Sequence, residues 1–234
     1  QKVSPTGFRL GVTEDWRSRW YSDKDYAKNL ENDLAIRSYL DKQLAHAAVS
    51  RVEIERAGDK IKVIITTSRP GVVIGKKGAE VDALRKKLNQ IANGPVSVEV
   101  VEVKRPELDA SLIAQSVAEQ LENRVAFRRA MRKAVQSARK SGAKGIRIQC
   151  AGRLGGAEMS RREWYREGRV PLHTLRAKVD YGFCTARTQM GAIGVQVWVY
   201  HGEVLPGQKA PQPALEGSSR PNRSRRRNND RGDK

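Results

Sequence analysis

The chain has 234 residues, a formal net charge of +19 and an isoelectric point near 10.3. This length accommodates two modest domains, and the charge indicates a polyanionic partner. No apolar run reaches the roughly 18–20 residues that cross a bilayer. The sequence contains no Cys-x-x-Cys spacing of the kind that indicates a zinc site. We also expect no signal peptide. These features exclude a membrane-spanning class and favour a cytosolic protein with two buried free thiols, Cys150 and Cys184.

Residues 1–22 contain interleaved aromatic and basic side chains, among them Phe8, Arg9, Trp16, Arg19 and Trp20. Such a segment either stacks on nucleic-acid bases or folds back onto its own domain. Hydrophobic periodicity then predicts a series of elements up to Pro106. They are a helix over 24–47, strands over 49–56 and 61–67, one helical turn at 72–74, a helix from 79 to about 91 and a strand over 96–100.

The following residues predict a second unit. Helical patterns cover 109–123 and 125–140, and strand-like segments cover 145–151, 162–170, 175–188 and 194–200. Two helices followed by consecutive strands indicate an α+β domain with a four-stranded antiparallel sheet. We therefore divide the chain into an N-terminal extension (1–16), a first domain (17–106), a second domain (107–206) and a basic tail (207–234). The tail has too few apolar residues to order itself when free.

A glycine turn, Gly75-Lys76-Lys77-Gly78, joins the short helical turn to the next helix. Its glycines allow close backbone approach, and its N–H groups, its lysines and the helix N-terminus favour phosphate. The preceding apolar residues would offer a groove to bases. The turn also resembles a nucleotide-binding phosphate loop, but Gly71 and Gly75 enclose three residues instead of four. Lys77 also occupies the place of the Mg²⁺-binding hydroxyl, which argues against ATP or GTP hydrolysis.

The predicted helix over 125–140 has one apolar face and two adjacent basic stripes. The first stripe is Arg128, Arg132 and Arg139, and the second stripe is Arg129, Lys133 and Lys140. Residues 125–140 contain no acid that could neutralise either stripe at i±4. Such a surface follows a phosphate backbone without reading its bases, whereas a solvated helix face usually mixes signs.

A glycine-rich loop at 152–156 carries Arg153 and precedes a second group of arginines. Arg161, Arg162 and Arg166 alternate with aromatic residues in this group, which suits phosphate pairing with stacking. A β-hairpin with core aromatics is an equal alternative. The acids here, Glu163 and Glu167, are expected to pair with the surrounding arginines.

Catalytic constellations are poor, since the three histidines are scattered and no common hydrolase, zinc or dinucleotide motif occurs. His201 is expected at the surface beside Gly202. We therefore expect that the protein is not an enzyme and that it binds no cofactor, metal or small-molecule substrate.

Several long stretches resemble the family of the third protein of the bacterial small ribosomal subunit, a KH-domain family of the subunit head. The matching stretches are residues 7–11, 69–78, 127–134, 152–158 and 164–177. The resemblance implies a type II KH domain whose Gly-x-x-Gly loop is Gly75–Gly78. It also implies a C-terminal α+β domain, and the partners small-subunit ribosomal RNA, messenger RNA and neighbouring head proteins. Arg128, Arg129 and Arg132 match family positions that line the messenger-RNA entrance channel and help to unwind structured messages.

The leading hypothesis is thus a structural RNA-binding component of the small subunit that holds or unwinds incoming message. With the glycine turn, the expected RNA-binding residues are the basic ones named above: Lys76, Lys77, Arg128, Arg129, Arg132, Lys133, Arg153, Arg161, Arg162 and Arg166. The alternatives are a free KH regulator of separate RNAs and a nuclease or NTP-driven helicase.

Overall fold

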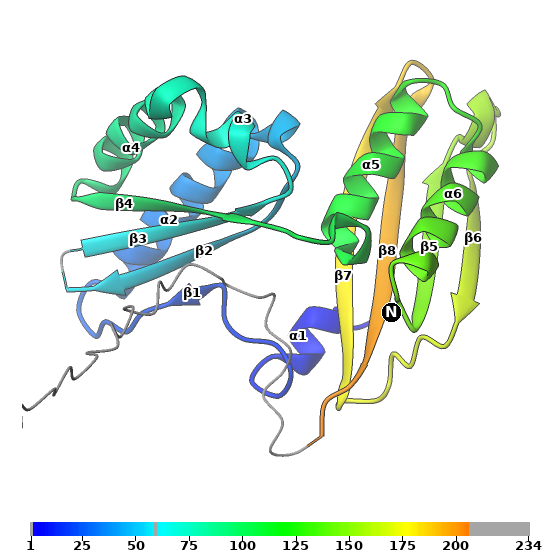
Figure 1. Ribbon diagram of the computed structural model, residues 1–234, viewed down its shortest axis with the longest axis horizontal. Coiled ribbons are helices and arrows are strands. Elements are labelled where there is room, and N and C mark those ends of the chain that lie inside the picture. The colour runs from blue at the N-terminus through cyan, green and yellow to red at the C-terminus, as the bar shows by residue number, and fades with distance from the viewer. Residues whose placement is uncertain (1, 59, 206–234) are drawn as a thin grey trace, which may run out of the picture.

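Two four-stranded sheets, each covered by helices on one face, form the body of this computed structural model (Figure 1). The structure describes residues 2–58 and 60–205, so the expected tail at 207–234 lies outside the described residues. No helix in these ranges is long and apolar enough to cross a membrane. Cys150 is buried and Cys184 half-buried, and both thiols are free.

The first sheet confirms the predicted order of elements. α2 (Tyr26–Gln43), β2 (Val49–Ala57), β3 (Lys60–Thr67), α3 (Pro70–Ile74), α4 (Ala79–Ala92) and β4 (Val96–Glu102) follow one another, with 3₁₀ turns at Ala45–Ala47 and Lys76–Gly78. β2 pairs antiparallel with β3, and β3 pairs parallel with β4. This is the arrangement expected of a type II KH domain. One apolar core joins the helices to the sheet, because Ile54, Val63 and Ile65 alternate onto the face that Leu40 and Leu88 cover.

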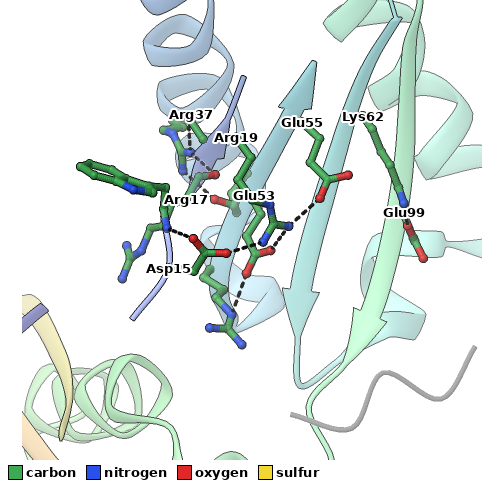
Figure 2. Close-up of polar contacts among 12 residues, drawn as sticks. Asp15, Arg17, Arg19, Arg37, Glu53, Glu55, Lys62 and Glu99 are labelled. Atoms are coloured by element: carbon green, nitrogen blue, oxygen red, sulfur yellow. Dashed lines mark hydrogen bonds and ion pairs between the residues drawn. The ribbon is translucent and has the colours of Figure 1, made fainter. Parts of the chain in front are cut away.

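The N-terminal residues fold onto their own chain at both ends of the segment. α1 (Pro5–Arg9) packs beside the second sheet, and β1 (Ser18–Arg19) adds a parallel edge strand to β2. Figure 2 shows the polar anchor of β1, in which Arg19 lies 2.9 Å from Glu53 and 2.6 Å from Glu55. The folding-back alternative is therefore correct for Arg9 and Arg19, while Phe8 and Trp16 remain exposed.

The second sheet confirms the expected antiparallel α+β unit. After a 3₁₀ turn at Pro106–Leu108 come α5 (Ala110–Glu122) and α6 (Phe127–Lys140). The strands are β5 (Gly145–Gly152), β6 (Arg161–Gly168), β7 (Ala177–Thr188) and β8 (Gly191–Glu203), with a 3₁₀ turn at Leu154–Gly156. Their spatial order is β6-β5-β8-β7, with every pairing antiparallel. Both helices cover the same face of this sheet (Figure 1).

Close backbone approach fixes α5 against β7. A Cβ on Gly182 would lie 2.2 Å from the carbonyl oxygen of Ala110, so only glycine fits there. Asp109 caps α5 by accepting hydrogen bonds from the backbone N–H groups of Ser111 and Leu112, and it also accepts one from the Ser50 hydroxyl. The cap of α5 therefore also contacts β2 of the first sheet.

Candidate nucleic-acid interface

The glycine turn has the backbone that its sequence predicts. Gly75 and Gly78 have φ values of 70° and 82°, and Lys77 also has a positive φ of 54°. A Cβ on Gly75 would lie 2.3 Å from Cγ of Glu80, which explains the glycine at that position. Lys76 and Lys77 are exposed, and within the described ranges neither forms an ion pair.

The surroundings of the turn combine an apolar shelf with two acids. Val72 and Ile74 in α3 are 42% and 41% exposed, so apolar side chains lie exposed beside the lysines, as the expected groove requires. The first turn of α4, however, contains Glu80 and Asp82. These carboxylates oppose phosphate binding at the helix N-terminus. The turn is therefore less attractive to anions than its two lysines alone indicate.

The two basic stripes of α6 differ in their environment. Met131, Val135 and Ala138 are buried against the sheet, as the periodicity predicts. The second stripe, Arg129, Lys133 and Lys140, is exposed and forms no ion pair in the part of the chain that the structure describes. It is a continuous row of unneutralised cations one helical turn or two apart.

The first stripe lies beside β6, whose acids partly neutralise it. Arg128 lies 3.6 Å from Glu163, and Arg139 lies 3.3 Å from Glu167. Arg132 has no carboxylate partner among residues 2–58 and 60–205, and it stacks over Tyr165, 5.6 Å from the ring centroid. The pairing of both acids with arginines agrees with expectation. The helix itself contains no neutralising acid, as expected, but the neighbouring strand β6 supplies Glu163 and Glu167.

The arginines of the predicted second group separate onto different surfaces. Arg161 faces α6, where it bonds Glu163 at 3.0 Å and lies over the Phe127 ring. Arg162 and Arg166 are exposed on the opposite side of β6, since their cross-strand neighbours Ala151 and Arg147 face away from the helices. The structure therefore does not bring all of these arginines to one site.

The side chain of Arg153 donates hydrogen bonds to the backbone of its own chain. Its Nε donates to the carbonyl oxygen of Ala157 at 2.8 Å, and its Nη1 donates to that of Met190 at 3.2 Å. These bonds hold the glycine-rich loop, in which Leu154 is buried and Gly155 has a φ of 68°. These bonds occupy two of the five N–H donors of the guanidinium.

A cavity of about 550 Å³ lies where the N-terminal segment and the two sheets meet. His201 lines this cavity and is half-buried, so it is less exposed than a residue on an open surface. Burial and nearby Lys178 lower the pKa of His201 to about 4. Burial raises the pKa of Glu14 and of Asp109, and the charge of neighbouring Asp180 also raises both. The strand pattern around His201 was a usable signal, because alternation from Val197 and Val199 places residue 201 on the helix-covered side.

Arg147 in β5 is a basic residue that the sequence analysis did not single out, and it lies beside Arg166 on the sheet face away from the helices. Its guanidinium lies 5.2 Å from the ring centroids of both Trp164 and Trp198. Arg147 alternates with buried Ile146 and Ile148 in β5, and this alternation was the available signal for an outward-facing cation.

No group of three or more His, Cys, Asp or Glu in residues 2–58 and 60–205 is arranged to hold a metal ion.

Comparison with known proteins identifies two matching domain families and a set of similar bacterial proteins. The family described as KH domain matches residues 35–108, and the family described as Ribosomal protein S3, C-terminal domain, matches residues 117–199. Small ribosomal subunit protein uS3 of Geobacter sulfurreducens is 61% identical over 209 residues, which cover 89% of this chain and 99% of that protein. The uS3 proteins of Syntrophus aciditrophicus (58% over 209 residues, 89% and 97%) and Trichlorobacter lovleyi (62% over 208 residues, 89% and 99%) are similar over equal extents.

Proposed function

Because the chain belongs to the family of small ribosomal subunit protein uS3, we propose that it binds ribosomal RNA within the small subunit and holds incoming messenger RNA with α6. The relatives are named as ribosomal proteins and not as enzymes, so an RNA-binding structural role is the coarse conclusion. In bacteria this places the protein in the cytoplasm, in the ribosome. Neighbouring proteins of the subunit head and the message itself are the finer part of the proposal.

The observation that carries the messenger role is the unneutralised second stripe of α6. Arg129 and Lys133 are exposed, lie one turn apart and have no carboxylate partner among the described residues. Arg132 extends this surface toward the Tyr165 ring. Fixed cations of this kind attract phosphates of any sequence, which suits a message whose sequence changes continuously.

The same stripe suggests how a passive surface assists unwinding. A duplex in front of the ribosome opens and closes spontaneously, and cations that hold one separated strand oppose its re-pairing. The energy for movement comes from the translating ribosome, so the chain needs no nucleotide site of its own. This agrees with the defective spacing of the phosphate-loop resemblance at Gly71–Lys77.

The glycine turn is a second RNA contact in this proposal. Lys76 and Lys77, which form no ion pair in the described part of the chain, lie beside exposed Val72 and Ile74, a combination suited to phosphates and bases of a single strand. Because Glu80 and Asp82 oppose anions there, we expect this contact to depend more on the apolar shelf than α6 does.

The test replaces Arg129 and Lys133 together by glutamine in assembled ribosomes. Two exposed charge contacts are together worth about 1 kcal/mol, so passage through a stable downstream hairpin should slow roughly five-fold. Passage along an unstructured message should change little. Single-ribosome translocation on matched messages with and without the hairpin measures both.

Arg139→Gln is the matched control on the same helix, because Glu167 already compensates that charge. It should leave hairpin passage close to normal. Equal slowing by both variants, or normal passage in the double variant with subunits correctly assembled, would contradict the messenger role and leave the ribosomal RNA role standing.

A further inference from the structure

The second sheet has a face that the helices do not cover. Its end near the N-terminal segment is closed, since Val170 and Leu172 pack against Val179, Trp198 and Tyr200. Toward the other end of the strands this face is open. β-strand alternation places Trp164, Gln149, Gln196 and Phe183 there, one from each strand.

These four residues form a straight line across the sheet, which we call the aromatic row. The registers pair Trp164 with Gln149, Gln149 with Gln196, and Gln196 with Phe183. The terminal aromatics are 53% and 58% exposed, although large apolar side chains are normally buried. Neighbouring strands are about 4.8 Å apart, so the backbone positions that carry the two rings are separated by roughly 14 Å.

The floor of the row consists of hydrogen-bonding side chains. Gln149 donates from Nε2 to Oε1 of Gln196 at 3.0 Å, and Arg147 donates from Nη2 to Oε1 of Gln149 at 3.2 Å. Nε of Arg147 is buried and has no partner among the described residues. The Gln196 amide group likewise donates to no acceptor within the described ranges. Nε of Arg147 is shielded from a ligand, so the Gln196 amide group is the unused donor that this floor presents between the two aromatic rings.

The charge around the row has one sign. Arg166 and Arg147 occupy the next line of residues on one side, and Arg162 occupies the next line on the other side. No residue that the registers place on this face between Val179 and Arg187, between Ala192 and Tyr200, or on β5 and β6 is acidic. Glu163 and Glu167 point to α6 instead.

The corresponding face of the first sheet is different. There Glu53 and Glu55 pair with Arg19, and Glu99 pairs with Lys62 at 2.7 Å (Figure 2). Its cations are thus neutralised within the chain, and no aromatic row crosses it in the described residues. The unbalanced charge therefore distinguishes this face from the corresponding face of the first sheet.

We propose that the aromatic row is a platform for two or three bases of single-stranded RNA, which stack on Trp164 and Phe183 while their phosphates contact Arg162 and Arg166. Exposed aromatics on a four-stranded antiparallel sheet bind bases in this manner in other RNA-binding domains. The unused Gln196 amide donors face base edges, and Arg162 and Arg166 complement a polyanion. This site lies on the opposite side of the sheet from α6 and does not depend on the proposed messenger role.

The binding test uses the full purified chain and a labelled, unstructured eight-nucleotide RNA. Lys76, Lys77, Arg129 and Lys133 are changed to glutamine as a common background, which weakens the other two proposed contacts. Trp164→Ala and Phe183→Ala should each lower affinity roughly ten-fold, the scale of one lost stacking contact. Because neither change removes charge, the slope of log affinity against log salt should stay constant.

Arg162→Gln and Arg166→Gln should instead each reduce that slope by about 0.7. Trp164→Phe should restore most of the affinity, and Tyr21→Ala, an 86% exposed aromatic away from the row, should have no effect. If Trp164→Ala binds RNA as tightly as Tyr21→Ala does, the platform does not exist. A loss that appears only as a change of salt slope would contradict stacking equally.

Ultraviolet crosslinking in assembled small subunits locates the occupant. Peptides containing Trp164 or Phe183 should be joined to nucleotides. Crosslinks from this face to a protein only, with no nucleotide adduct, would show that another protein occupies it and would overturn the proposal. Normal hairpin passage by the Trp164→Ala ribosome is expected, which separates this result from the test of α6.

Discussion

Arg9 shows how one residue can fix the position of a terminal segment. Its guanidinium is fully buried and donates to the carbonyl oxygens of Pro5, Pro171, Leu172, Thr174 and Ala177. Burial lowers the pKa of Arg9, and the charge of Glu14 partly offsets this. The planar fork of donors matches several acceptors at once, which a lysine ammonium does not.

We therefore predict that Arg9→Lys is not conservative. It would leave buried carbonyl oxygens without donors and lower the free energy of unfolding by roughly 2–4 kcal/mol. Urea unfolding measures this loss, and trypsin should release the N-terminal segment faster. Arg176→Lys is the control, because that arginine is 63% exposed and its Glu203 partner lies at the surface. A loss no larger than that of the control would show that the carbonyl cluster does not hold α1.

At the scale of elements, Glu163 in β6 neutralises part of the positive charge on the surface that α6 and β6 share. Glu163 lies 3.0 Å from Arg161 and 3.6 Å from Arg128. Glu163→Gln would release both guanidinium groups for phosphate contact. We predict tighter RNA binding and a salt slope that is steeper by up to about 1.4.

Anisotropy titrations of a single-stranded RNA at several salt concentrations check this prediction. Glu158→Gln is the matched control, because it removes the same charge from an exposed residue that pairs with no arginine in the described ranges. Identical slopes in the two variants would mean that Arg128 and Arg161 do not gain a phosphate contact when Glu163 is removed.

Most of these elements could be predicted from the sequence, because their apolar residues repeat with a regular period. Leu84 and Leu88 marked α4, and Val52 and Ile54 marked β2, through local spacing alone. The burial of Arg9 could not be predicted, since four of its five acceptors are 162 to 168 positions away in the sequence. The backbone bonds of Arg153 were similarly hidden, because nothing in its neighbourhood identifies Met190 as a partner. The positions of basic stripes were predictable, but their degree of neutralisation required the tertiary structure.

For the whole molecule, the cavity between the sheets makes stability depend on pH. His201 has a pKa of about 4 in the folded chain, below its ordinary value near 6.5. The unfolded chain therefore binds more protons between these pH values, and acidification across this range lowers stability. Glu14 and Asp109 have raised pKa values, and their protonation opposes this loss.

The comparison of His201→Gln with the native chain isolates the histidine. The native chain should lose up to about 3 kcal/mol of unfolding free energy relative to the variant between pH 6.5 and 4. Above pH 6.5 the difference between the two proteins should be constant, which is an internal control. Urea unfolding at a series of pH values gives both quantities. A difference that does not change with acidification would show that the folded chain protonates His201 as readily as the unfolded one.

The order in which the chain is made acquires importance from the position of α1. Arg9 leaves the ribosome early, but Ala177, whose carbonyl it contacts, is added 168 residues later. At about 5–20 residues per second, the N-terminal segment waits roughly 10 to 30 seconds for its binding surface. The first sheet can assemble its core from α2 to β4 in this interval, with β1 joined to it. Docking of α1 is then a late step of biosynthesis, because its binding surface includes residues 171–177 of the second unit.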